Sequence, residues 1–175
     1  MIRTPEATLG PFFPPHYADA GASDLATGAR GEPIEIHGRV TQEDGAPVHN
    51  LVLEIWQADA AGIYRHPADR RHREADPGFL GWGRAATGTD GRYAFRTLRP
   101  GAPRGRAPHV NFMLMYSGLM RILSTTMFFS DAADPVLAAV PEARRALLLA
   151  QPDGPGRYRF DIRLRGENET PFLED

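Results

Sequence analysis

A hairpin signal and a strand pattern adjoin each other in the stretch Thr89-Asp90-Gly91-Arg92-Tyr93-Ala94-Phe95-Arg96-Thr97-Leu98. Asp-Gly next to an alternating run is a strong indicator of a tight turn between β-strands. After the turn, aromatic and β-branched side chains alternate with other residues, so that Tyr93, Phe95 and Thr97 share one face of a strand. The stretch therefore predicts a strand with one face buried against a core.

The same period of two recurs along the chain. Ile34, Ile36 and Val40 are separated by polar residues, and residues 158–164 alternate so regularly that they predict an antiparallel strand with one solvated face. Apolar runs predict three further strands, at residues 51–56, 109–116 and 123–129. The 18 glycines and 16 prolines are spread between these runs as turn residues. About seven short strands at this spacing predict an all-β protein, an antiparallel β-sandwich.

One segment has the composition of a helix. Residues 141–150 begin with Pro141 and continue with strong helix formers, so we expect one short peripheral helix there. Residues 1–32 have no strand or helix periodicity and predict an extended N-terminal arm. Residues 33–175 are then expected to form a single β-sandwich domain, with a polar loop over residues 65–83.

Composition excludes several classes of function. The formal net charge of −2 gives no basic footprint for nucleic acid. The absence of cysteine excludes disulfides, thiolate zinc sites and a cysteine nucleophile. No segment approaches the roughly 18 apolar residues of a membrane span, and the first residues lack the apolar region of a signal peptide. We expect a cytoplasmic protein with neither nucleic-acid nor membrane partners.

A metal site without cysteine would depend on the six histidines. His66 and His72 lie in the expected loop, where two solvated imidazoles are the simplest interpretation. His109 and Asn111 are more informative, because positions i and i+2 of a strand point the same way. They could present two ligands to one site, but asparagine is a poor partner for imidazole at a transition metal. From spacing alone we favour a buried, hydrogen-bonded polar pair.

Several motifs occur in a fixed order along nearly the whole chain. They are Thr8-Leu9-Gly10-Pro11-Phe12-Phe13, Leu53-Glu54-Ile55-Trp56-Gln57-Ala58-Asp59, Gly62-Ile63-Tyr64, Thr89-Asp90-Gly91-Arg92-Tyr93, Pro100-Gly101, Ala107-Pro108-His109-Val110-Asn111 and Arg159-Phe160-Asp161-Ile162-Arg163. Together they resemble one enzyme family, the intradiol ring-cleavage dioxygenases. The resemblance implies a β-sandwich whose catalytic chains hold non-haem Fe(III) with two tyrosines and two histidines.

The resemblance implies that this chain retains only part of the ferric ligand set. Tyr64 matches the first ligand tyrosine, whereas residues 102–107, where the second is expected, contain none. His109 matches one ligand histidine and Asn111 replaces the other. Loss of one phenolate and one imidazole removes most of the donors that suit a ferric ion. We therefore expect Tyr64, His109 and Asn111 to be vestigial ligand positions, with no metal bound and no catalytic residue in this chain alone.

Two-chain members of the family imply a different role. The resemblance is greatest to their alpha chains, which pack against a homologous beta subunit that carries the Fe(III). Thr8, Gly10 and Pro11 match an arm motif whose backbone lines the partner's cavity beside a small aromatic substrate. A substrate-binding position that is often Arg in alpha chains is Thr126 here. The function implied is a non-catalytic subunit that completes a partner's substrate pocket and is inactive alone.

Two other functions are compatible with the sequence. The strand and Asp-Gly turn pattern also fits a transthyretin-like β-sandwich module that binds a ligand or has a structural role without enzymatic activity. A self-sufficient enzyme is the other alternative, with a new metal site built from Tyr64, His109 and the loop histidines.

Overall fold

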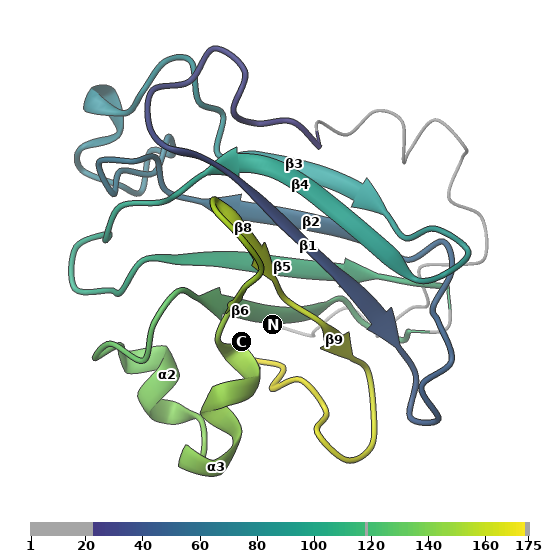
Figure 1. Cartoon of the computed structure of the whole chain (residues 1–175). Coiled ribbons are helices and arrows are strands. Elements are labelled where there is room, and N and C mark those ends of the chain that lie inside the picture. The colour runs from purple at the N-terminus through teal and green to yellow at the C-terminus, as the bar shows by residue number, and fades with distance from the viewer. Residues whose placement is uncertain (1–22, 118, 174–175) are drawn as a thin grey trace, which may run out of the picture.

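Two β-sheets lie face to face in the computed structural model, which describes residues 23–117 and 119–173 (Figure 1). The first sheet has the order β4-β1-β8-β7, with β9 also paired to β1, and the second has the order β3-β2-β5-β6. This confirms the predicted all-β sandwich. The strands are β1 (Pro33–Thr41), β2 (Val52–Gln57), β3 (Trp82–Ala86), β4 (Arg92–Leu98), β5 (His109–Met115), β6 (Leu123–Phe128), β7 (Gln151–Pro152), β8 (Arg157–Arg159) and β9 (Ile162–Arg163).

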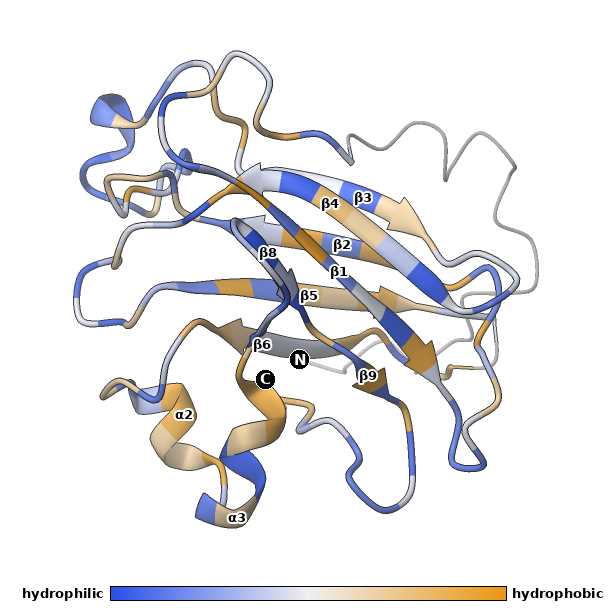
Figure 2. Cartoon of the chain, viewed as in Figure 1, coloured by the Kyte–Doolittle hydropathy of each residue, from blue (hydrophilic) through white to orange (hydrophobic). Residues whose placement is uncertain are grey.

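The core lies between the sheets and follows the predicted alternation. Ile36 of β1 lies opposite Phe95 of β4, and both are buried. Phe112 of the second sheet contacts Phe95 and Phe160, with ring centroids 6.4 and 5.3 Å apart. Hydrophobic and hydrophilic residues accordingly alternate along β1 (Figure 2). Burial of each such large side chain contributes about 1.5–3 kcal/mol, so these contacts hold the sheets together.

The Asp90-Gly91 turn connects strands of opposite sheets. It joins β3 to β4, whereas β4 pairs with β1. Gly91 has a φ of +76°, and a side chain there would meet the Val40 carbonyl oxygen at 2.6 Å. The turn prediction is therefore correct at the local level, but the strands on either side of the turn are not partners.

The C-terminal strand matches the predicted direction on one side only. Residues 158–164 were expected to pair antiparallel. β8 does pair antiparallel with β7, but β8 and β9 each run parallel to β1. The segment is interrupted at Phe160, whose carbonyl accepts a hydrogen bond from the Tyr93 hydroxyl at 2.5 Å. Alternation indicates which face of a strand is buried and carries no information about the direction of the partner strand.

The expected helix at 141–150 is shorter than predicted. It consists of α3 (Glu142–Arg145) and a 3-10 turn (Ala146–Leu148), after which the Ala150 amide donates to the Phe128 carbonyl at 2.8 Å. Because Ala150 pairs with the end of β6, the helix ends before residue 150. A second short helix, α2 (Pro135–Ala139), was not predicted, although Asp134 caps its N-terminus and Pro135 follows.

Residues 65–83 include more structure than the loop that we expected. A 3-10 turn forms at His72–Glu74, and β3 begins at Trp82 and pairs with β2. Glycine and alanine make up most of β3, so its composition does not indicate a strand.

The described end of the predicted arm packs against the sandwich. The Arg96 amide donates to the Ser23 carbonyl at 2.8 Å, and the Leu25 amide donates to the Arg96 carbonyl at 2.7 Å. Leu25 is 6% exposed and belongs to the core. The division into an arm (1–32) and a domain (33–175) stays a prediction, and residues 1–22 lie outside the described residues. No helix of the described part is long and apolar enough to cross a bilayer.

Candidate functional site

Three strands of the second sheet place polar side chains in one row. Trp56 of β2 is paired with Asn111 of β5, which in turn is paired with Thr126 of β6. Phe112 points into the core, so Asn111 and His109 point to the opposite face of the sheet. The shared orientation that the spacing predicted for His109 and Asn111 is therefore present.

Hydrogen bonds connect this row to Tyr64, which lies in the loop after β2. The Tyr64 Oη and the His109 Nε2 are 2.9 Å apart, and the Asn111 amide donates to the Tyr64 Oη at 3.4 Å. The Thr126 hydroxyl donates to the Asn111 Oδ1 at 3.0 Å. The His109 Nδ1 lies 2.7 Å from the Ala107 carbonyl oxygen. All four predicted site residues within the described chain thus form one connected network.

Burial determines the protonation states in this network. It raises the pKa of the Tyr64 hydroxyl, and it lowers the pKa of His109. Both groups are therefore neutral near pH 7. Since the carbonyl of Ala107 can only accept, Nδ1 of His109 carries the proton, and the Tyr64 hydroxyl donates to Nε2. Each donor then has an acceptor.

These residues do not fit a ferric ion. Both ring nitrogens of His109 are engaged, the first with Ala107 and the second with Tyr64. Asn111 offers a neutral amide whose oxygen already accepts from Thr126. Fe(III) would require anionic or imidazole donors in these places. Within the described ranges, His, Cys, Asp and Glu form no group of three that could hold a metal ion.

An Arg–Asp pair behind the network holds the loop that precedes β5. The buried Asp134 accepts from the Arg106 Nε at 2.7 Å and from the Ala107 amide at 2.9 Å. Although burial acts to raise the pKa of Asp134, the hydrogen bonds from Arg106 and the backbone lower it. Asp134 thereby positions Ala107, whose carbonyl orients the His109 ring. The sequence did not indicate Arg106 or Asp134 as residues of the site. The only local signal was Asp134 followed by Pro135, a pair that is typical of the start of a helix.

The other predicted residues lie elsewhere. Thr8, Gly10 and Pro11 fall outside the described residues, so their role stays a prediction. Thr126 is 2% exposed, and its hydroxyl is bonded to Asn111. Of the loop histidines, His66 is exposed, and its ring packs edge-on against the ring of Trp56.

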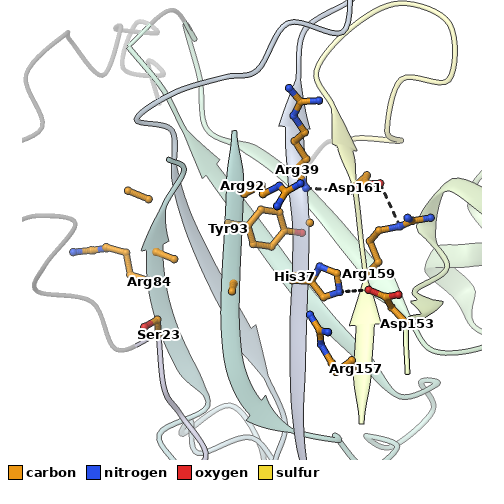
Figure 3. A pocket seen from close by; sticks show the side chains of 14 residues that line it. Ser23, His37, Arg39, Arg84, Arg92, Tyr93, Asp153, Arg157, Arg159 and Asp161 are labelled. Carbon is orange, nitrogen blue, oxygen red and sulfur yellow. Dashed lines mark hydrogen bonds and ion pairs between the residues drawn. The ribbon is translucent and has the colours of Figure 1, made fainter. Parts of the chain in front are cut away.

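A separate hollow of about 1120 Å³ lies on the outer face of the first sheet (Figure 3). His37 of β1 contacts Asp153 at 2.9 Å, and Arg159 contacts Asp161 at 3.5 Å. Arg157 contacts Glu35 at 3.0 Å on the same face. Among the described residues, five arginines and two aspartates line the hollow, so these ion pairs neutralise only part of the positive charge on this open surface.

Comparison with known sequences identifies residues 10–166 as a dioxygenase family region. The protocatechuate 3,4-dioxygenase alpha chain of Burkholderia cepacia is 39% identical over 196 aligned positions, which cover 99% of this chain and 98% of that protein. The beta chain of the same enzyme and organism is 41% identical over 160 positions, which cover 81% of this chain and 68% of that protein. The protocatechuate 3,4-dioxygenase alpha chain of Pseudomonas putida is 36% identical over 161 positions, which cover 83% of this chain and 78% of that protein.

Solved structures share the architecture. The dioxygenase domain of a dioxygenase carbohydrate-binding protein fusion from Streptomyces sp. SirexAA-E has a TM-score of 0.63 at 26% identity, covering 93% of this chain and 99% of that one. Hydroxyquinol 1,2-dioxygenase from Pseudomonas putida DLL-E4 shares the fold, with a TM-score of 0.61 at 23% identity. The match covers 92% of this chain and 67% of that one.

Proposed function

The chain belongs to the family of intradiol ring-cleavage dioxygenases, and we propose that it is the non-catalytic alpha subunit of a protocatechuate 3,4-dioxygenase. Such an enzyme uses O2 to open protocatechuate to 3-carboxy-cis,cis-muconate. In this proposal a homologous beta subunit holds the Fe(III), and this chain completes the beta subunit's substrate pocket. The chain alone is inactive.

The observation that carries the proposal is the closed hydrogen-bond network at the family's ligand positions. Tyr64 and His109 are bonded to each other, and Asn111 is bonded to Thr126. To coordinate a metal, His109 would have to give up the hydrogen bond that it accepts from Tyr64, and two further donors would be needed. The chain therefore depends on another subunit for the ferric centre.

Coverage supports the alpha assignment over the beta assignment. The identities to the two Burkholderia cepacia chains are similar, 39% and 41%. The match extends over 98% of the alpha chain but over 68% of the beta chain. A chain built like an alpha subunit along its whole length is expected to assemble like one.

The arm residues Thr8, Gly10 and Pro11 supply the contact with substrate in this proposal. A glycine and a proline suit a backbone that approaches a flat ring closely, since the first has no side chain and the second has a fixed φ. Thr126 makes its hydrogen bond within its own chain, so its assigned contact with substrate remains a prediction.

Co-expression with a homologous chain that carries two ligand tyrosines and two ligand histidines tests the proposal. We expect the two chains to co-purify, with iron in proportion to the partner chain and ring-cleaving activity only in the complex. A ferric centre bound stoichiometrically by this chain alone would overturn the proposal in favour of a self-sufficient enzyme. A stable lone chain that no such partner binds would favour the transthyretin-like module.

A further inference from the structure

The hollow of about 1120 Å³ lies over the outer face of the first sheet, opposite the face that packs on the core (Figure 3). Outward side chains of β1, β4 and β8 form rows across this face. In one row, Arg39 of β1 is paired with Arg92 of β4. In the next row, His37 of β1 lies between Ala94 of β4 and Arg159 of β8. The family's ligand positions on β5 belong to the second sheet, so the hollow is separate from them.

Small residues keep the hollow open. Ala94 lies between Arg92 and Arg96 on the exposed face of β4. Ala85 and Ala86 of β3 line the hollow at its edge. A ligand can therefore approach the sheet at Ala94, with long arginine side chains on both sides.

Arginines outnumber acids in the lining. Among the described residues, the lining contains two aspartates and five arginines, which are Arg39, Arg84, Arg92, Arg157 and Arg159. Three of these arginines each contact one carboxylate, and the pairs are Arg84 with Glu54, Arg157 with Glu35 at 3.0 Å, and Arg159 with Asp161 at 3.5 Å. Arg39 and Arg92 are left to share Asp90, which lies in the turn beside them.

Arg39 and Arg92 are like charges directly opposite each other on two strands, an arrangement that destabilises a sheet. The Arg39 Nε donates to the Asp90 carbonyl oxygen at 2.8 Å, and Arg39 makes no ion pair within residues 23–117 and 119–173. The Arg92 Nε lies 3.4 Å from the Asp90 Oδ2, and 79% of the Arg92 side chain is exposed. The Nη groups of both arginines therefore have no acceptor in the described part of the chain.

The two aspartates of the lining are already engaged. The Asp153 Oδ2 contacts the His37 Nε2 at 2.9 Å, as Figure 3 shows. The Asp161 Oδ1 accepts from the Arg39 backbone amide at 3.0 Å, and its Oδ2 faces Arg159. Positive charge at Arg39 and Arg92 thus remains for an anion from outside the chain.

The layout of the arginines selects among anions. Outward side chains lie about 5 Å apart across neighbouring strands and about 7 Å apart two residues along a strand. Guanidinium groups on three strands thus offer donors at several points of one broad hollow. A compact anion such as phosphate engages one of these points, whereas an open-chain molecule with two or more carboxylates engages several. Guanidinium groups also bind carboxylates through paired hydrogen bonds, which adds geometric selectivity.

From the unshared charge, the open floor and this spacing, we propose that the hollow binds a small open-chain polycarboxylate. One carboxylate bridges Arg39 and Arg92 and relieves their repulsion, and a second is held by Arg159 on the far side of β1. This goes beyond the proposed function, because it assigns a ligand to the outer face of the first sheet and requires neither iron nor a partner chain.

Backbone-amide NMR of the full chain provides the test, with tricarballylate (propane-1,2,3-tricarboxylate) as the probe. The ionic strength is held constant, because salt screens exposed charges. We expect saturable shifts of the Arg39, Arg92 and Ala94 amides, with a Kd of about 5 mM or less, and at least about tenfold weaker binding of acetate. No saturable shift up to about 10 mM, or saturable shifts only elsewhere in the chain, would overturn the proposal. Phosphate that binds as tightly as tricarballylate would overturn the polycarboxylate assignment.

A pair of charge-matched variants separates a site from a general charge effect. Arg39→Gln should weaken tricarballylate binding about tenfold or more, because it removes one of the two guanidinium groups that the carboxylate bridges. Arg73→Gln makes the same charge change at an exposed position that does not line the hollow, and it should change binding less than about twofold. Equal loss in both variants would refute the site.

A third variant tests the shape of the hollow without changing its charge. Ala94→Leu fills the floor at an exposed strand position, so the fold should tolerate it. Binding of tricarballylate should weaken at least about fivefold, and unchanged binding would refute the proposed position of the ligand. Because no partner or iron enters these titrations, their failure would leave the proposed function unaffected.

Discussion

The hydroxyl of Tyr64 lies 2.9 Å from Nε2 of His109, although 45 residues separate them in the chain. The bond joins a loop after β2 to the first residue of β5 and engages the ring nitrogen that a metal would need. A phenol and an imidazole that are both kept neutral by burial satisfy each other. We predict that this pair, at positions where the family resemblance implies ferric ligands, is a structural element instead.

Tyr64→Phe should therefore destabilise the fold and leave iron content unchanged. The substitution leaves Nε2 of His109 without its donor, and an unsatisfied buried acceptor costs about 1–3 kcal/mol. Chemical denaturation would measure the loss in the free energy of unfolding. Tyr116→Phe is the control, because Tyr116 packs against the core and its hydroxyl has no bonded partner in the described ranges. If iron in the assembled enzyme falls with Tyr64→Phe, the tyrosine is a ligand and the interpretation of the network is wrong.

The stability of the chain should depend on pH through His109. Its pKa in the folded chain lies below the ordinary value of 6.5, so the unfolded chain binds this proton more readily. The stabilisation is complete above about pH 6.5 and is lost as the pH falls toward the folded-state value, with a slope of at most about 1.4 kcal/mol per pH unit.

His109→Gln provides the comparison for this pH dependence. Both chains share the other five histidines. The difference in unfolding free energy between wild type and variant should shrink as the pH is lowered from about 7.5 to about 5.5. A difference that stays constant over this range would show that His109 does not titrate with folding.

Gly38→Ala should be among the most damaging small substitutions in the sandwich. A Cβ atom at Gly38 would lie 1.9 Å from the carbonyl oxygen of Phe160, which also accepts the Tyr93 hydrogen bond. Backbone must move to relieve this contact, so we expect a loss of about 3 kcal/mol or more in unfolding free energy. Gly88→Ala serves as the control, since its nearest contact is a flexible Asp90 carboxylate oxygen at 3.2 Å. Similar losses for both would contradict the role of the Gly38–Phe160 contact.

The sequence predicted those parts of the fold that depend on burial. Alternation identified β1 and β4, because their inward side chains form the core. It did not identify β3, whose Gly83 and Ala85 have little strand preference and are held by pairing with β2. The helix over 141–150 ends early for the same kind of reason, because Ala150 pairs with Phe128 across the chain.

The candidate site was predictable only in part. Strand spacing gave the shared face of His109 and Asn111, and the family resemblance added Tyr64. Nothing local in the sequence indicates that Arg106 bonds to Asp134, 28 residues away, because that contact joins two loops whose positions depend on the completed sheets.

Gly10→Val tests the arm. If the backbone of the Thr8–Pro11 motif forms a wall of the partner's cavity, a valine side chain occupies space meant for the substrate ring. The KM for protocatechuate should then rise several-fold, with kcat, iron content and subunit ratio unchanged, because the lost interaction is one of substrate binding. Ala7→Val adds similar volume beside the motif and should leave KM unchanged. If Gly10→Val lowers activity only in step with loss of the partner, Gly10 serves assembly, and an unchanged KM in a complete complex would remove the arm from the active site.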